Sequence, residues 1–251
     1  MKTNRWPLRH GLRALLFGAA VAAGVFAAPA ALAQSQLLIL DEGSFSLLRD
    51  GERIGREDFG IRATRGGVGG AFIAQGNILF GEQRRAVMLN VDSLGNPLRV
   101  QLELRNEGVL VQSVVGELDR GVWSGRVAHR VGESARAFRL PMDTFVAEEG
   151  LVHHLWFVVR FGEGRPVTLF TPSVLSQIRV LVQEEAPDRV ALGLREIVAR
   201  RWSLRSASSG TLLYEVWTNA SGRLLRVIDH GTGIEALRDE PPAETRPPLR
   251  S

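Results

Sequence analysis

The sequence contains no cysteine. It therefore offers no disulfides, no thiolate ligands for a metal and no cysteine for bacterial N-terminal lipidation. A G-x-S-x-G elbow is also missing, and no serine stands in a strand–turn–helix context, so no motif indicates a hydrolase. A serine triad assembled from distant positions stays an open alternative, but we expect no catalytic residues and a protein that is not an enzyme.

The chain after residue 33 also lacks a net charge. The whole sequence has 31 Lys and Arg residues against 27 Asp and Glu residues. Lys2, Arg5, Arg9 and Arg13 lie within residues 1–33, which contain no acid, and without them the two signs balance. A surface that binds phosphates needs a surplus of positive charge. We therefore expect no nucleic-acid partner.

The basic start of the chain precedes an apolar, alanine-rich run from Leu15 to Ala30. Ala31 and Ala33 then supply the small residues of a cleavage site, so residues 1–33 are predicted to be a secretory signal peptide cut after Ala33. The alternative is an uncleaved membrane anchor, but the run is short and Pro29 lies near its end. The expected location is the periplasm or the medium, with no stable membrane anchor after cleavage.

Most of the remaining chain alternates between apolar and polar residues, as amphipathic strands do. One stretch shows this plainly, with Leu98, Val100, Leu102 and Leu104 on one face and Arg99, Gln101, Glu103 and Arg105 on the other. Asp50-Gly51 between two extended runs is a strong hairpin signal. Further turns are expected at residues 185–188, 219–222 and 229–233, and the closing stretch Leu212–Asp239 is expected to form a sheet edge.

One segment breaks the alternation and predicts a helix at about residues 143–161. Asp143 or Thr144 would cap its start, Arg160 lies in its last turn, and Gly162 stands where a helix ends. Gly150 leaves a break in this helix open. Its apolar side chains point in all directions, which predicts burial on all sides. The candidate ligand-binding residues are Phe145, Leu151, His154, Leu155, Trp156, Phe157 and Phe161.

These elements together predict a mainly β fold. We expect one domain at residues 34–238, in which a strongly curved antiparallel sheet, a half-barrel of about ten or eleven strands, is wrapped around the central apolar helix. Residues 239–251 are rich in proline and predicted to be a disordered tail.

Several short motifs of the chain resemble a group of exported bacterial proteins of unknown function. They are the hairpin DGERIG, the central LPMDTFVAEEGLVHHLWFVVRF, the following GRPVTLFTPS and the closing VWTNASGRLLRVIDHG. The sheet of that group resembles the half-barrel of the periplasmic lipoprotein-localisation carriers. The likeness covers most of the chain after the leader, and it differs at Asn219, where the group's closing turn has an acid. It implies an envelope protein and carries over no catalytic residues.

Two short motifs invite a metal site or a phosphate-binding loop, but neither has the required spacing or residues. His153 and His154 are adjacent on the expected helix and point about 100° apart, so they do not chelate one metal ion as histidines four residues apart do. Glu149 lies four residues before His153 and would permit two ligands, but no H-E-x-x-H motif is present. The glycine-rich stretch Arg65–Gly70 lacks the Lys-Ser/Thr of a phosphate loop. We therefore expect no metal site and no cofactor.

Two functions remain for a non-catalytic envelope protein. The first is binding or carrying a lipid or other apolar ligand in the concave face of the sheet. The second is a structural or assembly factor that holds an envelope protein partner and has a filled core. The volume between helix and sheet separates the two, because a ligand pocket needs several hundred cubic ångströms.

Overall fold

The computed structural model describes residues 37–64 and 72–243. Within these ranges the chain forms fifteen strands and the single helix α1 (Leu155–Phe161). The strands are β1 (Leu37–Arg49), β2 (Glu52–Thr64), β3 (Phe72–Phe80), β4 (Gln83–Val91), β5 (Pro97–Asn106), β6 (Val109–Asp119), β7 (Val122–His129), β8 (Gly132–Arg139), β9 (Thr144–Val146), β10 (Pro166–Thr171), β11 (Ser176–Leu192), β12 (Arg195–Ser206), β13 (Leu212–Thr218), β14 (Leu224–Asp229) and β15 (Ile234–Arg238).

Some expectations lie outside the described residues and stay predictions. They are the signal peptide at residues 1–33, the glycine-rich stretch Arg65–Gly70 and the end of the tail from residue 244. At the start of the expected tail, Asp239 is ordered, because it accepts hydrogen bonds from the Ser44 hydroxyl at 2.7 Å and the Ser46 hydroxyl at 2.6 Å. No helix in the described ranges is long and apolar enough to cross a membrane.

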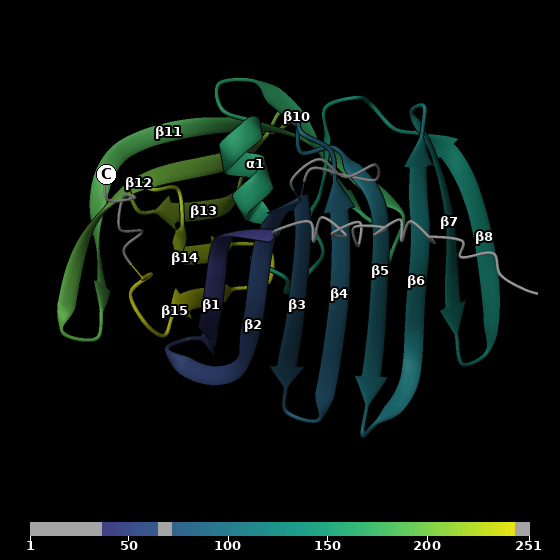
Figure 1. Ribbon diagram of the computed structural model, residues 1–251, viewed down its shortest axis with the longest axis horizontal. Helices are drawn as coiled ribbons and strands as arrows, with labels where there is room; N and C mark the ends of the chain where they lie inside the picture. Colours follow the sequence, from purple (N-terminus) through teal and green to yellow (C-terminus); the bar gives the residue numbers. More distant parts are fainter. Residues whose placement is uncertain (1–36, 65–71, 244–251) are drawn as a thin grey trace, which may run out of the picture. The chain divides into compact units, whose positions relative to one another are not determined.

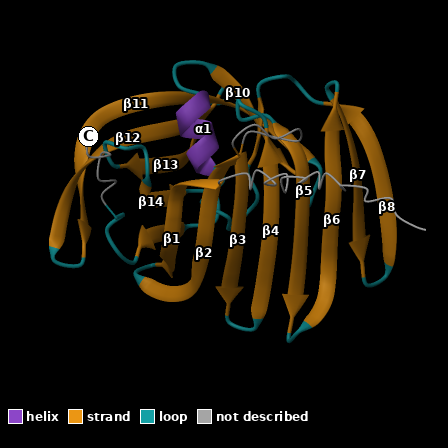
Figure 2. Ribbon diagram, viewed as in Figure 1, coloured by secondary structure: helices purple, strands orange, loops and turns teal. Residues whose placement is uncertain are grey.

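All fifteen strands belong to one sheet, in the order β8-β7-β6-β5-β4-β3-β2-β1-β15-β14-β13-β12-β11-β10-β9. Every pairing is antiparallel except that of β9 with β10. Figures 1 and 2 show the strands β1 to β8 side by side in sequence order. The predicted fold class, a mainly β protein with one helix against a large curved sheet, is confirmed. The predicted strand number was too low. Two of the strands that were not expected are β8, which is exposed on both faces and lacks the amphipathic pattern, and β9, which lies in the segment predicted to be helical.

Tight hairpins connect neighbouring strands where two successive residues have positive φ. The predicted Asp50-Gly51 turn is confirmed, with φ of 53° and 81°. The pairs Glu107-Gly108 and Arg120-Gly121 have the same signs, with first φ angles of 51° and 47°. This geometry matches the right-handed twist of the flanking strands, and it explains why β5, β6 and β7 follow one another as neighbours.

The expected turn at residues 185–188 is wrong. β11 continues without interruption through this stretch, and its pairing with β12 shifts in register between Glu185 and Asp188. Pro187 has no amide hydrogen for the ladder, so it is tolerated at such a bulge. The chain reverses only at Gly193, whose φ is 58°.

The helix is shorter than the predicted span of residues 143–161. Thr144 caps nothing; it begins β9, and its hydroxyl bonds the Pro141 carbonyl at 2.7 Å. Gly150 has a φ of 74°, which no helix residue adopts, so the break left open in the sequence is present. The predicted end is confirmed, since the Gly162 amide bonds the Val158 carbonyl at 2.8 Å.

The closing stretch Leu212–Asp239 forms the expected strands β13 to β15, and the Gly222 amide closes its first turn on the Asn219 carbonyl at 2.9 Å. Its expected place at a sheet edge is wrong. β15 pairs with β1, and Phe45 lies opposite Arg238 in the register. The last strand thus joins the two halves of the sheet, β1 to β8 and β9 to β14, because the start and the end of the domain meet there.

The main core lies on the inner side of the curved sheet, where α1 is packed. Phe72 of β3 contacts Trp156, with ring centroids 6.2 Å apart, and Gly162 at the helix end faces Val167 of β10 and Val182 of β11. The sheet curls far enough for β9 to contact β5 but does not close into a barrel. A second apolar cluster, Val190, Leu192, Ala199, Trp217 and Leu225, packs β11 to β14 together.

Candidate functional site

The seven candidate residues of the central segment are brought together in the core. Phe145, Leu151, His154, Leu155, Trp156 and Phe157 are each at most 3% exposed, and Phe161 is half-buried. Phe72 lies among three of them, with its ring centroid 6.1 Å from that of Phe157 and 5.7 Å from that of Phe161. These side chains pack against one another and the sheet, so their role in binding a ligand stays a prediction.

Among the pockets that the described residues line are five well-formed ones, and none of the seven candidate residues lines any of these five. The pocket nearest to them in sequence has a volume of about 310 Å³ and is lined partly by Glu149 and Gly150, ahead of the helix. The six buried candidates thus pack against protein side chains of the described residues, which favours the filled-core alternative drawn from the sequence.

A buried carboxylate fixes the segment that leads into the helix. Glu57 of β2 is fully buried and accepts hydrogen bonds from the amides of Val152 at 2.9 Å and His153 at 3.2 Å. It also contacts Nδ1 of the His153 ring. Gly76 of β3 makes room for this ring, because any Cβ there would collide with it. The pair orients His153 and satisfies the backbone of an irregular segment in the core.

Glu57 is not among the residues singled out from the sequence. Glu57 shares a face of its strand with Phe59 and Ile61, which are both buried. A carboxylate on the apolar face of an alternating strand is the signal that could have revealed it, because a buried charge needs partners.

His154 is the other fully buried histidine, and its two ring nitrogens have no hydrogen-bond partner among the described residues. Burial lowers the pKa of His154 well below the usual 6.5, and the neighbouring His153 ring lowers it further. His154 is therefore neutral in the folded state. A proton donor or acceptor that no solvent or substrate reaches is poorly placed for catalysis.

The described residues contain no group of three His, Asp or Glu side chains that could hold a metal ion. His153 instead pairs with Glu57, and the Glu149 carbonyl accepts a hydrogen bond from Arg85. The preceding residue, Glu148, accepts hydrogen bonds from the amide of Ser173 at 3.2 Å and from the Ser173 hydroxyl. Burial raises the pKa of Glu148 above its usual 4.5, while these hydrogen bonds act in the opposite direction.

A second buried pair, also missed in the sequence, holds the junction of the two halves. Arg238 of β15 donates to Asp41 of β1 at 2.9 Å, and the other oxygen of Asp41 accepts the Leu224 amide at 2.9 Å. The guanidinium lies over the ring of Phe59, 5.4 Å from its centroid. Since all its partners are structural, this pair fixes the fold and is not a binding site.

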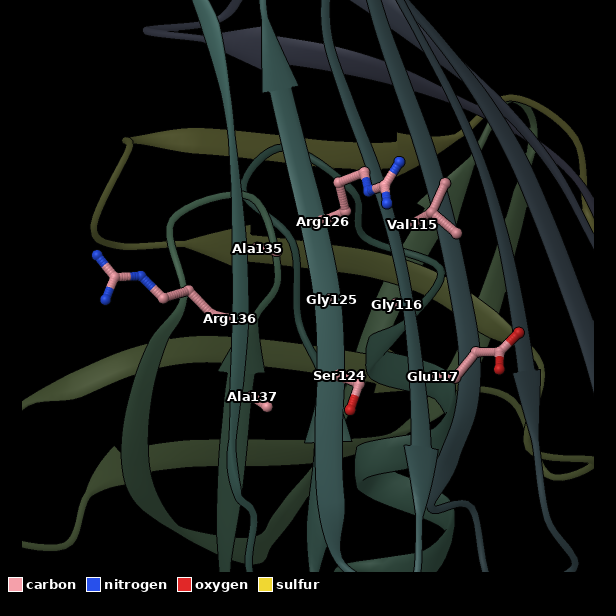
Figure 3. Close-up of a pocket in the computed structure, with 9 residues that line it drawn as sticks. All are labelled: Val115, Gly116, Glu117, Ser124, Gly125, Arg126, Ala135, Arg136 and Ala137. Atoms are coloured by element: carbon pink, nitrogen blue, oxygen red, sulfur yellow. The ribbon is translucent and has the colours of Figure 1, made fainter.

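A wide groove lies elsewhere, on the outer face of β6, β7 and β8. It has a volume of about 660 Å³, and its lining residues are Val115, Gly116, Glu117, Ser124, Gly125, Arg126, Ala135, Arg136 and Ala137 (Figure 3). Ser124, Ala135 and Ala137 have small side chains, which leaves this face hollowed. The lining residues Val115 and Glu117 are exposed, whereas their neighbour Val114 faces the core.

The groove runs along the free edge of the sheet. β8 is the terminal strand and pairs only with β7, so one side of its backbone has no strand partner among the described residues. All eight residues of β8 are exposed except Phe138, which packs on Phe170 with ring centroids 5.7 Å apart. An unpaired strand edge is a template for another extended segment.

Comparisons with known proteins bear on the fold alone. No protein-family model matches the chain, and no curated protein matches it. Among solved structures, it is similar to a β-barrel-like protein of a domain of unknown function, DUF1849, from Brucella abortus, with 11% identity and a TM-score of 0.52. The match covers 84% of this chain and 100% of that chain. The chain thus shares its fold with a bacterial β-sheet protein of unknown function; no likeness to a lipoprotein carrier follows.

Proposed function

We propose that the chain is a non-catalytic exported envelope protein that holds a protein partner on the outside of its sheet, as a structural or assembly factor. The observation that supports it most is the filled inner face. Trp156 and Phe157 of α1 are at most 2% exposed, and neither lines any of the five pockets described above. A carrier of acyl chains needs an enclosed apolar cavity of several hundred cubic ångströms.

Two further observations favour this proposal over an enzyme or a lipid carrier. The buried ionisable groups Glu57, His153 and His154 are beyond the reach of a substrate, since each is fully buried. The accessible features are instead a strand edge and a groove beside it, both on β8. Surfaces of this kind bind extended protein segments through main-chain hydrogen bonds and side-chain pockets.

Photo-crosslinking in cells tests the proposal. A photoreactive phenylalanine analogue is introduced singly at exposed positions on different faces, namely Val115, Ala135, Leu194 and Val198. We expect a discrete protein adduct from at least one position, and none from a buried control such as Leu204, which is 0% exposed. The absence of protein adducts from all four exposed positions would contradict a partner-binding role.

A second measurement addresses lipid carriage directly. The protein is recovered from the periplasm without detergent, extracted with organic solvent and analysed by mass spectrometry. We expect lipid well below one molecule per protein. A stoichiometric lipid that is lost in a Trp156→Ala variant which still folds would overturn the proposal in favour of a carrier.

A further inference from the structure

We propose that the free edge of β8 binds an extended acidic segment of a partner protein as a sixteenth, antiparallel strand, with its bulky side chains in the groove beside that edge. This rests on the proposed partner-binding function and adds the chemistry of the partner. Three features of the described residues carry it: the unpaired backbone, the small residues and the unpaired arginines.

The backbone of β8 is accessible over its whole length of eight residues. β8 contains no proline or bulge, and its pairing with β7 runs without a shift from Val122–Arg139 to His129–Gly132. All neighbouring pairings from β1 to β8 are antiparallel, so the same twist would continue into an antiparallel strand. The other end of the sheet offers no such template, because β9 has three residues and all are buried.

The outer face next to this edge is hollowed because it carries small side chains. Ala135 lies opposite Arg126, and Ala137 lies opposite Ser124, so the two central outward-facing positions of β8 carry only methyl groups. The groove of about 660 Å³ follows from this (Figure 3). Directly opposed residues of paired strands point to the same face and approach to about 5 Å. Large side chains of an added strand opposite Ala135 and Ala137 would therefore lean over the groove.

The charges along the edge select the partner. Glu133 is already paired with Arg126 at 2.7 Å, which leaves Arg136 and Arg139 as the charged side chains of β8. Neither has an acidic side chain within ion-pair distance in the described part of the chain. In Figure 3, the Arg136 side chain points away from β6 and β7, beyond the edge strand. An incoming strand with carboxylates opposite these two positions would pair both.

The register then predicts a sequence pattern for the partner. An antiparallel segment places one acid opposite Arg139 and a second acid three residues later, opposite Arg136. The residues opposite Ala137 and Ala135 are the third and fifth of this pattern. The expected motif is acid, any residue, bulky apolar residue, acid, bulky apolar residue. The two acids lie on opposite faces, because Arg136 and Arg139 are an odd number of positions apart.

Synthetic peptides test this with the full mature chain. The probe is a capped, fluorescent decapeptide of threonine with Glu at its third and sixth positions and Leu at its fifth and seventh. The matched control exchanges the sixth and seventh residues, so the composition is the same and the register is broken. Fluorescence anisotropy at low salt measures both. We expect the probe to bind roughly tenfold more tightly than the control, since charge and groove contacts act together only in the first.

A charge exchange decides whether the arginines make the contact. The double variant R136E/R139E is expected to weaken the probe roughly tenfold or more and to bind a peptide with Lys in place of Glu. The variant R195E changes an equally exposed arginine on β12 and should leave probe binding unchanged. Equal binding of probe and control, or no recovery with the Lys peptide, overturns the inference.

The outcomes separate this inference from the proposed function. Crosslinks to a protein from Leu194 or Val198 with none from Ala135 leave partner binding intact and refute the β8 site. Adducts joining Ala135 to a second copy of the same chain, with a dimer in sedimentation, refute the acidic partner in favour of self-association. No protein adduct from any exposed position removes both.

Discussion

The two ends of the sheet are built in opposite ways. β9 has three residues, all buried; it runs parallel to β10 and contacts β5. β8 has eight residues, nearly all exposed, and runs antiparallel to β7. The end at β9 is thus covered by other parts of the sheet, while the end at β8 is left exposed among the described residues.

The difference also shows how charge is placed. Near the inner end, the polar group Glu148 is bound by Ser173, because buried polar groups need partners. At the outer end, Arg136 and Arg139 stand without acids among the described residues. Charged side chains on an edge strand hinder unspecific pairing with other edges. The same arginines would admit a strand that brings complementary acids, so protection and selectivity are compatible.

The largest expected contrast between the ends comes from truncating one apolar residue at each. Phe145→Ala removes a fully buried ring from β9 and should lower the free energy of unfolding by about 3–5 kcal/mol. Val131→Ala, beside β8, removes a side chain that is 99% exposed and should change it by less than about 0.5 kcal/mol. Urea denaturation of both variants measures this. Equal effects would mean that the inner end is not packed as described.

Adding a methyl group sharpens the comparison with a smaller effect. Gly76→Ala places a Cβ against the His153 ring on the inner face, and we expect a loss of about 1–3 kcal/mol from overpacking. Gly132→Ala at the start of β8 meets no atom within 4 Å and should be nearly neutral. Thermal unfolding followed by circular dichroism compares them. A destabilised Gly132→Ala variant would show that the open edge is covered.

The inner face should also make the fold sensitive to acid through His154. The folded pKa of His154 lies well below 6.5, so as the pH falls below about 6.5 the unfolded chain takes up a proton that the folded chain does not. Stability is thus fully present above that pH and falls below it, by up to about 1.4 kcal/mol per pH unit. Urea denaturation from pH 7.5 to 5.5 measures the slope, and His154→Leu should lack this part of it. An unchanged slope in the variant would contradict the burial of a neutral ring.

The smallest effect is expected at the open edge itself. Arg126 and Glu133 join β7 to β8 at 2.7 Å, but their side chains are 67% and 48% exposed. Solvent screens such a pair, so a double-mutant cycle with alanine should give a coupling of about 0.2–1 kcal/mol. A coupling of several kcal/mol would instead indicate that the edge is shielded from water.

Much of the fold could be predicted from local patterns. The alternation over Leu98 to Arg105 and the Asp50-Gly51 turn depend on residues close in sequence, and both are confirmed. The fold class follows from them. The start of the helix could not be predicted, because Thr144 to Val146 is held as a strand by its pairing with β10, which lies farther along the chain. Tertiary pairing overrides weak local preferences in this way.

The candidate site was predicted less well than the fold. The apolar pattern of the sequence points to Trp156 and its neighbours, which are buried in the core, whereas β8 has no periodic pattern that would mark it as a strand. The sequence pattern also gives no sign that Glu57 and His153, ninety-six positions apart in the chain, are partners. A pair so distant in sequence leaves no local pattern.

The class of fold and the exclusion of thiol chemistry follow from strand periodicity, turn residues and composition, which can all be seen locally in the chain. Which surfaces are closed and which are open depends on contacts between residues far apart in sequence. Whether an apolar helix lines a cavity or fills it depends on how tightly the sheet curls. Whether a strand is an edge depends on which distant strand pairs with it, as β15 pairs with β1 and none of the described strands covers the free side of β8.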